Sequence, residues 1–158
     1  MGVRVRPATR EDLDAIVAIE RASFSDPWSP RLLGDELEAD PRRRPFVALD
    51  DDRIVGFALF WVIVDEIHLV NVAVAPEARR RGVAQAMLDH VLTTEAGRRA
   101  AIMTLEVRVT NEAAIAFYRR NGFVDVALRP RYYPDTGEDA LVMLKTLRGP
   151  SPGAAGRL

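Results

Sequence analysis

Hydrophobic and polar residues along the chain follow two periods, which predict alternating segments of strand and helix. Val3 and Val5 alternate with arginines and predict a short strand that Pro7 stops. Apolar residues then recur at helical spacing from Thr9 to about Ala22, and a second helix is expected after Ser29 and Pro30. Strands are expected at 46–49, 54–64, 67–74, 103–109, 123–128 and 140–144, and helices at 83–97 and 111–120.

The element order βααβββαβαββ predicts an α/β (α+β) fold, with a sheet of mixed strand direction flanked by helices. A chain of 158 residues suits one domain with a single core, which we place at residues 1–148. The segment GPSPGAAGRL lacks apolar periodicity, so we expect residues 149–158 to form a disordered tail.

Three positions in this pattern carry a specific expectation. Glu20 falls on the apolar stripe of the first helix, and we expect a helix-end carboxylate paired with an arginine. Gly56 interrupts the long strand at 54–64, which predicts a bend or bulge. Residues 40–45, DPRRRP, are expected to be a basic surface connection, because a helix does not cross two prolines.

Composition excludes several kinds of chemistry. The chain has 48% hydrophobic and 28% charged residues and a formal net charge of −1, so it has no global field that would attract nucleic acid. The absence of cysteine excludes thiolate metal sites and a cysteine nucleophile. His68 and His90 are too few for a histidine-rich metal site, and we expect no metal; His90 is placed on the surface.

No apolar run reaches the roughly 20 residues that a membrane-spanning helix requires. The polar start MGVRVRPATRED does not resemble a signal peptide, and Arg6 stands where a myristoylation motif has Ser or Thr. The sequence therefore predicts a cytoplasmic protein.

The segment at residues 70–92, VNVAVAPEARRRGVAQAMLDHVL, carries the most informative pattern. Three arginines follow an apolar strand and precede Gly82, and an amphipathic helix begins at Val83. A helix start exposes unpaired N–H groups at the positive end of the macrodipole, and a small residue lets a ligand approach the backbone. The segment predicts an anion site, with a pyrophosphate as the favoured anion. The alternative is an ordinary turn with a solvated basic surface.

Missing residues exclude two common phosphate loops from this segment. A P-loop requires GxxxxGK[ST], but the segment has no lysine and a single glycine. A Rossmann fingerprint requires GxGxxG after the first strand of a βαβ unit. The pattern that remains is R-x-x-G-x-A at residues 79–84.

Glu106 is a second candidate for chemistry. In the strand expected at 103–109, the apolar residues at odd positions share one face, while Glu106 lies on the other face. An unpaired carboxylate is costly in a strand that is buried on both sides. Either that face opens into a cleft, which makes Glu106 a candidate general base, or Glu106 pairs with a neighbour such as Arg108.

The segment at residues 111–123 and two aromatic loops add further candidates. Asn111 begins an amphipathic helix that contains Tyr118 and stops at Gly122. Taken alone, Asn111 would be only a helix cap and Tyr118 only a packed aromatic. Three aromatic side chains in two predicted loops either line a groove for a substrate chain or cover an exposed core edge; they are Trp28, Tyr132 and Tyr133.

The pattern N-x-x-A-x-x-x-Y-x-x-x-G-F at residues 111–123, together with R-x-x-G-x-A at 79–84, resembles the two halves of a domain of the GNAT superfamily of N-acetyltransferases. Within that superfamily, several stretches are similar to the ribosomal-protein-alanine N-acetyltransferase (RimI-type) family. They are DPWS at 26–29, DEIHLVNVAV at 65–74, LEVRVTNEAAIAFY at 105–118 and RYYP at 131–134. The resemblance covers residues 3–147, and Ala84, where many members have glycine, is a mild departure.

The resemblance implies a mixed, mostly antiparallel, twisted sheet and acetyl-CoA as cosubstrate. It implies that the acetyl-pantetheine arm lies along the backbone of Val72, Ala73 and Val74. The pyrophosphate would be held by Arg79, Arg80, Arg81, Gly82, Val83, Ala84 and Gln85. Asn111 would contact the coenzyme, Glu106 would accept a proton and Tyr118 would donate one.

Reference pKa values agree with these implied roles. An α-amine has a pKa of about 7.7–8.0, so a modest base can supply the free amine, whereas a lysine amine near 10.4 needs more help. A tyrosine with a reference pKa near 10 stays neutral and can donate a proton to the departing thiolate. Strand N–H groups can stabilise a developing oxyanion. Without cysteine, we expect direct transfer within a ternary complex.

The resemblance leads us to expect an acetyl-CoA-dependent enzyme that acts on a protein N-terminus, with the N-terminal alanine of a small-subunit ribosomal protein as the leading substrate. One alternative is a GNAT enzyme that acts on other protein N-termini, lysines or small amines. Another is a non-enzymatic acyl-CoA-binding module. We expect neither nucleic acid nor a membrane as a direct partner, and a monomer is favoured.

Overall fold

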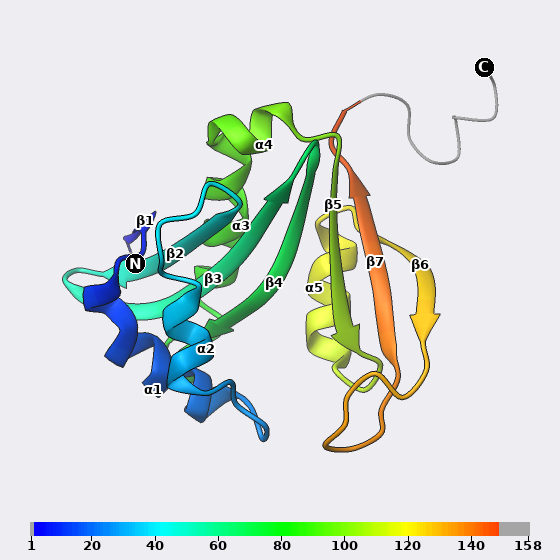
Figure 1. Cartoon of the computed structure of the whole chain (residues 1–158), viewed down its shortest axis with the longest axis horizontal. Helices are drawn as coiled ribbons and strands as arrows, with labels where there is room; N and C mark the ends of the chain where they lie inside the picture. The colour runs from blue at the N-terminus through cyan, green and yellow to red at the C-terminus, as the bar shows by residue number, and fades with distance from the viewer. Residues whose placement is uncertain (1, 149–158) are drawn as a thin grey trace. The chain divides into compact units, whose positions relative to one another are not determined.

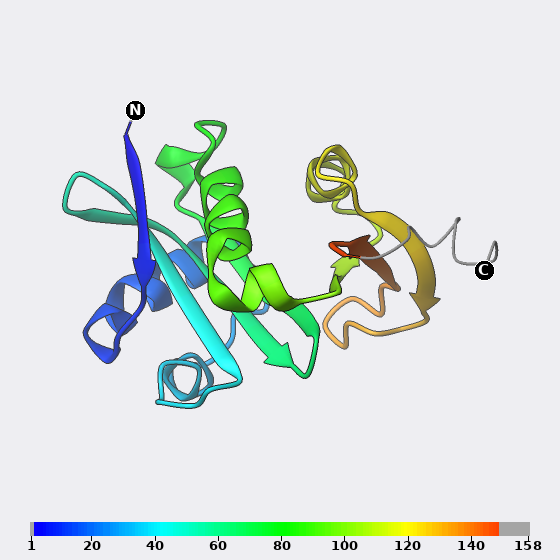
Figure 2. The same cartoon turned by 90° about the horizontal axis from the view of Figure 1, so that it is seen from above.

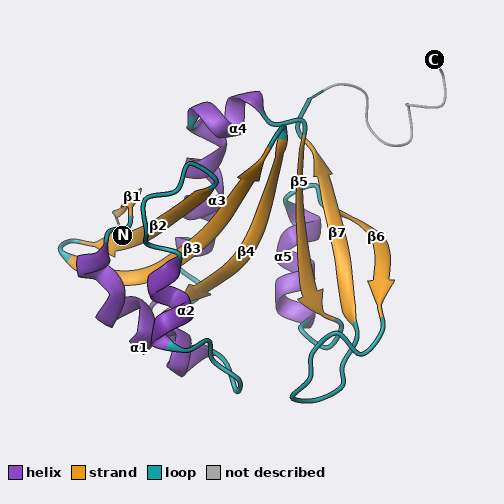
Figure 3. Cartoon of the chain, in the orientation of Figure 1, coloured by secondary structure: helices purple, strands orange, loops and turns teal. Residues whose placement is uncertain are grey.

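The computed structural model describes residues 2–148, and the tail expected at 149–158 lies outside these residues (Figure 1). In chain order the elements are β1 (Val3–Pro7), α1 (Leu13–Ser23), α2 (Pro30–Asp35), β2 (Arg43–Asp50), β3 (Arg53–Ile63), β4 (Glu66–Val74), α3 (Val83–Thr93), α4 (Glu95–Arg99), β5 (Ile102–Arg108), α5 (Glu112–Arg120), β6 (Val124–Arg129) and β7 (Ala140–Thr146). Figure 3 shows these helices, strands and loops in separate colours. Short 3-10 turns at Arg10–Asp12 and Pro76–Ala78 precede α1 and the three arginines. Among the described residues, no helix is both long enough and apolar enough to cross a membrane.

The strands follow the order β1-β2-β3-β4-β5-β7-β6. β1 with β2, β2 with β3, β5 with β7 and β6 with β7 pair antiparallel, and β4 pairs with β5 parallel. This confirms the predicted sheet of mixed, mostly antiparallel direction. The described residues form two compact units: unit 1 contains residues 2–62 and 70–98, and unit 2 contains residues 63–69 and 99–148.

Unit 1 buries its central strands on both faces. The four residues of β3 from Phe57 to Phe60 are all at most 2% exposed, as are Val47 and Ala48 of β2. In the two views, α3 lies on one face of these strands, and α1 and α2 lie on the other (Figures 1 and 2). The run FALF therefore does not alternate between apolar and polar, because neither face of β3 meets water.

Strand β3 carries the irregularity that Gly56 predicts. The register with β2 shifts between Ala48 and Leu49, which pair with Gly56 and Ile54 and leave Val55 as the extra residue. A Cβ on Gly56 would lie 3.0 Å from Val83 Cγ1, 3.1 Å from the carbonyl oxygen of Ala73 and 3.2 Å from Met87 Cε. Helix α3 thus packs directly on the β3 backbone, and only glycine leaves room for it.

Strand β2 begins earlier than expected, at Arg43 within the predicted surface connection 40–45. Arg43 and Arg44 pair with Trp61 and Phe60 of β3. Pro45 is tolerated in this strand because the β1 ladder reaches only Phe46, and the Pro45 carbonyl accepts a hydrogen bond from the backbone N–H of Ala8 (2.9 Å). The expectation of a connection through residue 45 was therefore wrong for its second half.

The structure divides the helix predicted at 83–97 into α3 and α4. The backbone of Thr94 is extended (φ −69°, ψ 165°). Its hydroxyl accepts a hydrogen bond from the N–H of Gly97 (3.2 Å), which caps α4. A Cβ on Gly97 would lie 2.2 Å from the carbonyl oxygen of Val91, so glycine is required where α4 meets the end of α3.

Strand β5 in unit 2 has two faces that differ in burial. The odd-numbered residues Met103, Leu105 and Val107 are buried, whereas the even-numbered residues at 104, 106 and 108 are only half-buried. Helix α5 borders a pocket together with Val109 and Leu141, and Leu141 pairs with Val107. Helix α5 therefore lies over the odd-numbered face, and Glu106 faces the opposite way.

We expect Gly56→Ala to lower the free energy of unfolding by about 1–3 kcal/mol, because the added methyl group would force α3 away from β3. The matched control is Gly34→Ala in α2, where the new methyl would lie 3.6 Å from Leu13 Cδ2 in ordinary contact. Since alanine is the better helix former, that change should leave stability unchanged or raise it. Denaturant titrations of both variants measure the difference, and equal stabilities would contradict the close packing.

Candidate active site

The three arginines and the glycine form a tight loop, the arginine loop (residues 79–82), that leads into α3. Arg80 and Gly82 both have positive φ values, 64° and 79°. Backbone N–H groups around such alternating conformations point into a shared concavity that suits an anion. Helix α3 starts at Val83, and its N-cap, Gly82, has no side chain that could bond the N–H groups of the first turn. Arg80 and Arg81 are exposed beside them.

Arg79 and Gln85 have protein partners of their own. Arg79 Nε donates to the carbonyl oxygen of Val74 (3.1 Å), and Arg79 Nη2 donates to Ser23 Oγ (3.3 Å). Arg79 therefore ties the arginine loop to the end of β4 and to the last turn of α1. Gln85 Nε2 donates to Asp89 Oδ1 within α3 (2.9 Å). Coenzyme contacts by these two residues stay predictions.

The end of β4 carries Val72, Ala73 and Val74 directly before this loop. Ala73 is buried against Gly56 and the other two are half-buried. The next N–H, of Ala75, donates to the carbonyl oxygen of Val55 in the β3 bulge (2.8 Å). The strand that would contact the acetyl-pantetheine arm is thus fixed by the bulge.

Glu20 is buried but does not pair with an arginine, so the expectation for it was wrong. Its side chain is 1% exposed in the last full turn of α1. Glu20 Oε2 accepts a hydrogen bond from the backbone N–H of Trp28, and Glu20 Oε1 accepts one from Asn71 Nδ2, both at 2.8 Å. Burial raises the pKa of Glu20, and these two hydrogen bonds partly offset that rise.

In unit 2, Glu106 lies on the half-exposed face of β5. Its side chain is 31% exposed, and its Oε1 lies 3.9 Å from Arg129 Nη2. The alternative that Glu106 pairs with Arg108 is not what the structure has, because Arg108 is engaged by Asp135 at 2.9 Å and Glu138 at 3.6 Å. Glu106 is therefore partly exposed and forms a long ion pair with Arg129, so the ion-pair alternative holds with a different arginine.

Tyr118 sits in a more apolar environment than Glu106. It is 6% exposed on α5 and stacks edge-on against Phe117 and Phe123, with ring centroids 5.4 and 5.5 Å apart. Burial, and then the neighbouring Tyr133, raise the pKa of Tyr118 above its usual value. Its hydroxyl therefore keeps its proton at neutral pH.

The connection between β6 and β7, the tyrosine loop (residues 130–139), is held by Arg108. The Arg108 guanidinium stacks over the ring of Tyr133 at 4.1 Å from its centroid, and Arg108 Nη1 donates to Thr136 Oγ1 (3.1 Å). Burial raises the pKa of Tyr133 to about 12, while Arg108 opposes that rise. Tyr132 stays 43% exposed beside it. Arg108 thus orders a loop that presents one half-buried and one exposed tyrosine.

Asn111 is the N-cap of α5, where its side chain accepts a hydrogen bond from the N–H of Ala114 (3.2 Å). It is exposed, so this capping role leaves its other amide atoms available. The cap alone accounts for its position, and coenzyme contact stays a prediction.

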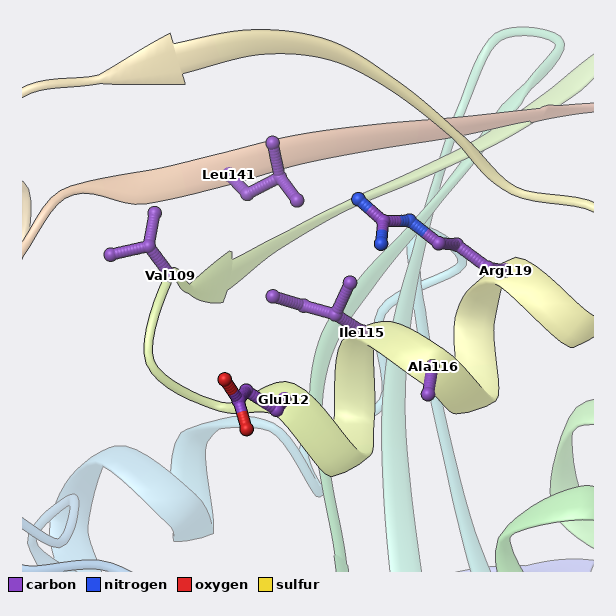
Figure 4. A pocket seen from close by; sticks show the side chains of 6 residues that line it. All are labelled: Val109, Glu112, Ile115, Ala116, Arg119 and Leu141. Carbon is purple, nitrogen blue, oxygen red and sulfur yellow. The ribbon is translucent and has the colours of Figure 1, made fainter.

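A pocket of about 440 Å³ in unit 2 lies on the other face of β5 (Figure 4). Its lining residues are Val109, Glu112, Ile115, Ala116, Arg119 and Leu141. None of the predicted site residues lines it. The pocket beside α5 is therefore not the predicted site.

The described residues thus gather the candidates in two groups. Unit 1 brings the backbone of Trp28 to Glu20 and Asn71, next to the end of β4 and the arginine loop. In unit 2, Tyr132 and Tyr133 meet edge-on, and Tyr133 interacts electrostatically with both Tyr118 and Glu106, whose pairing as acid and base stays a prediction. The pairing of Trp28 with the two tyrosines in one groove stays a prediction. Within residues 2–148, no group of three or more His, Cys, Asp or Glu side chains could hold a metal ion.

Sequence reasoning missed three contributors to these groups. Arg129 approaches Glu106, and its guanidinium lies 5.7 Å from the ring centroid of Tyr132. Asn71, the polar residue of an apolar strand, was visible as an exception but had no assigned partner. His90 is half-buried against Phe46, with ring centroids 5.3 Å apart, and is therefore less exposed than expected. The contacts of Arg129 with Glu106, of Asn71 with Glu20 and of His90 with Phe46 join residues far apart in sequence, which no local pattern encodes.

Comparison with known proteins identifies the family. The sequence profile of the acetyltransferase (GNAT) family matches residues 13–123. The chain belongs to the acetyltransferase (GNAT) family. It is therefore an acetyl-CoA-dependent N-acetyltransferase, and the resemblance seen in its sequence is confirmed.

Several relatives of this GNAT enzyme match it over most of their length. The chain is 36% identical over 134 residues to the [ribosomal protein bS18]-alanine N-acetyltransferase of Escherichia coli (strain K12), covering 84% of this chain and 89% of that protein. It is 33% identical over 155 residues to the N-alpha-acetyltransferase RimI of Mycobacterium tuberculosis, covering 94% and 96%.

Solved structures of GNAT enzymes share the fold. The crystal structure of the ribosomal-protein-S18-alanine N-acetyltransferase from Escherichia coli superposes with a TM-score of 0.85 and 31% identity, covering 96% of this chain and 97% of that one. Arabidopsis thaliana NAA60 in complex with acetyl-CoA has a TM-score of 0.82 over 92% and 99% of the two chains, at 18% identity, and this likeness shows the fold alone.

We expect Gly82→Val to weaken acetyl-CoA binding about tenfold, because a β-branched residue resists the left-handed conformation that shapes the arginine loop. The matched control is Gly122→Val after α5, where φ is +90°. That change carries the same backbone strain and should lower stability without changing affinity. Isothermal titration with acetyl-CoA and thermal melting separate the two effects. Equal affinities of Gly82→Val and the wild type would count against the loop as the pyrophosphate site.

Proposed function

We propose that this GNAT enzyme acetylates the N-terminal α-amino group of a protein, and that its leading acceptor is the N-terminal alanine of a small-subunit ribosomal protein. The observation that carries the proposal is the 36% identity, over 84% of the chain, to an Escherichia coli enzyme named for acetylating the alanine of ribosomal protein bS18. A ribosomal acceptor also supports a cytoplasmic location.

Unit 1 fits the acetyl-CoA donor. The left-handed Arg80 and Gly82, the uncapped start of α3 and the exposed arginines suit a pyrophosphate. The adjacent end of β4 offers an extended backbone to an amide-containing arm. When bound, acetyl-CoA supplies a thioester carbonyl as the electrophile. Val72, Ala73 and Val74 orient the arm, and strand N–H groups stabilise negative charge on the carbonyl oxygen.

Glu106 is the group proposed to accept a proton from the acceptor amine. An α-ammonium with a pKa of about 7.7–8.0 is already partly neutral at pH 7, so a half-exposed carboxylate is a sufficient base, directly or through a water. A lysine ammonium at about 10.4 would need a much stronger base. The half-exposed position of Glu106 therefore suits an α-amine better than a lysine as the acceptor.

Tyr118 is proposed to donate a proton to the departing thiolate. Its burial raises its pKa, so the hydroxyl is protonated throughout the working range. The two groups therefore have complementary environments, because Glu106 is accessible to solvent and Tyr118 is not. Tyr132 and Tyr133, with Trp28 from unit 1, are proposed to contact the acceptor chain.

The acceptor class is tested with N-terminal peptides and acetyl-CoA. Peptides that start with Ala or Ser should be acetylated at their α-amine. The same peptides with a blocked N-terminus and an internal lysine should react at least about 10²-fold more slowly at pH 7, because so little of the lysine is deprotonated. Mass spectrometry locates the acetyl group. Faster turnover of the lysine or of a small amine such as spermidine would contradict the proposal.

The role of Glu106 is tested by the pH dependence of Glu106→Gln. At pH 6.5 the rate should fall by about 10²-fold, because the base that deprotonates the α-ammonium is missing. The deficit should shrink as pH rises through the amine's own pKa, since solvent then supplies the free amine. Glu66→Gln, the same change on neighbouring β4, is the control and should match the wild type. A pH-independent deficit would mean that Glu106 is not the base.

A further inference from the structure

Glu20 is the one buried carboxylate in residues 2–148 for which no ion pair is seen. The other two, Asp12 and Glu36, face Arg6 at 2.8 Å and Arg43 at 3.7 Å. Glu20 has instead only two neutral donors, the backbone N–H of Trp28 and Asn71 Nδ2. It also lies in the last full turn of α1, where the helix macrodipole disfavours a negative charge.

This arrangement is not explained by folding stability. Burial without a cation raises the pKa of Glu20, so its charged form is disfavoured in the folded protein. Replacing a buried charge by an apolar residue of similar volume is often neutral or stabilising. A leucine or methionine would also continue the apolar stripe of α1. The carboxylate is therefore best explained by what its two hydrogen bonds hold in place.

Both hydrogen bonds lead to residues of the proposed site. Trp28 belongs to the segment between α1 and α2, the Trp28 loop (residues 24–29), which is proposed to contact the acceptor. Asn71 precedes Val72 on β4, where the donor arm is proposed to bind. Three residues beyond Glu20, Ser23 Oγ accepts the hydrogen bond from Arg79 of the arginine loop. The last turn of α1 thus contacts the acceptor loop, the donor strand and the pyrophosphate loop.

We propose that Glu20 is a positioning residue that fixes the Trp28 loop to β4 and thereby sets the distance between the acceptor N-terminus and the donor arm. The inference rests on the proposed function for its kinetic consequence. Its structural part, the anchoring of Trp28 by Glu20, holds whichever amine is the acceptor. A carboxyl group has two oxygens, so it can hold a backbone N–H with one and a side-chain amide with the other at the same time.

Glu20→Met tests the anchor, because methionine fills the space without accepting either hydrogen bond. The KM for an Ala-starting peptide should rise about tenfold, while the affinity for acetyl-CoA and the melting temperature stay near wild type. Glu20→Gln should restore the peptide KM to within about twofold of wild type. The oxygen of the new glutamine can accept the hydrogen bond from the Trp28 N–H. Its NH₂ group can donate to the side-chain oxygen of Asn71 once the Asn71 amide flips.

The matched control is Glu36→Met, which removes the other buried glutamate of unit 1. Glu36 accepts from Trp61 Nε1 at 2.7 Å and does not touch the Trp28 loop. This variant should melt at a lower temperature, because Arg43 loses its partner, yet keep the wild-type peptide KM. A similar rise in peptide KM for Glu36→Met and Glu20→Met would overturn the proposal. The rise would then come from a general loss of packing in unit 1 and not from the loss of the Trp28 anchor.

Amide hydrogen exchange of Trp28 gives a readout that does not depend on turnover. In Glu20→Met this N–H loses its acceptor, so its exchange should accelerate about tenfold or more, while it stays slow in Glu36→Met. If the wild-type enzyme fails to acetylate peptides, the proposed function is wrong and Trp28 exchange still tests the anchor. Unchanged exchange and unchanged peptide KM in a folded Glu20→Met enzyme would overturn the inference.

Discussion

Helix α3 can lie on β3 only because Gly56 has no side chain, and the donor half of the site depends on that contact. Val83 and Met87 occupy the space that a Cβ would fill. The same bulge offers the Val55 carbonyl to the N–H of Ala75, where β4 ends. Both ends of the segment that contains the arginine loop are therefore fixed to one irregularity of β3. The positive φ values of Arg80 and Gly82 then shape the loop between these two fixed ends.

Polar contacts at the end of α1 supply a second set of constraints in unit 1. Ser23 Oγ accepts a hydrogen bond from Arg79, and the Glu20 carboxylate accepts hydrogen bonds from the backbone N–H of Trp28 and from Asn71 Nδ2. These bonds are individually modest, but each joins a loop to a regular element and so reduces the number of conformations the loop can adopt. Function in this fold requires loops, because strands and helices alone present few free backbone groups. The ordering of those loops by α1 is what makes a defined site possible.

Unit 2 separates two ionisable groups by environment. Glu106 faces the half-exposed side of β5, where a carboxylate can remain charged and accept a proton. Tyr118 is buried among Phe117 and Phe123, where the neutral phenol is favoured. Desolvation penalises the charged form, so the buried phenol of Tyr118 keeps its proton. Unit 2 thus holds a partly exposed carboxylate and a buried phenol in different environments.

The sequence by itself indicated most of the elements, the strand at 67–74, the irregularity at Gly56 and the family, because these depend on local periodicity, turn chemistry and short motifs. It missed the break between α3 and α4 and the early start of β2. It also placed Glu106 on the face opposite the apolar residues of β5, since side chains of a strand alternate. Only the tertiary structure decided the partners: Arg108 with the tyrosine loop, Arg129 near Glu106, and Glu20 with Trp28 and Asn71. Hydrogen bonds and ion pairs join residues up to 56 positions apart, and the apolar pattern that folds the chain does not specify which polar groups will meet.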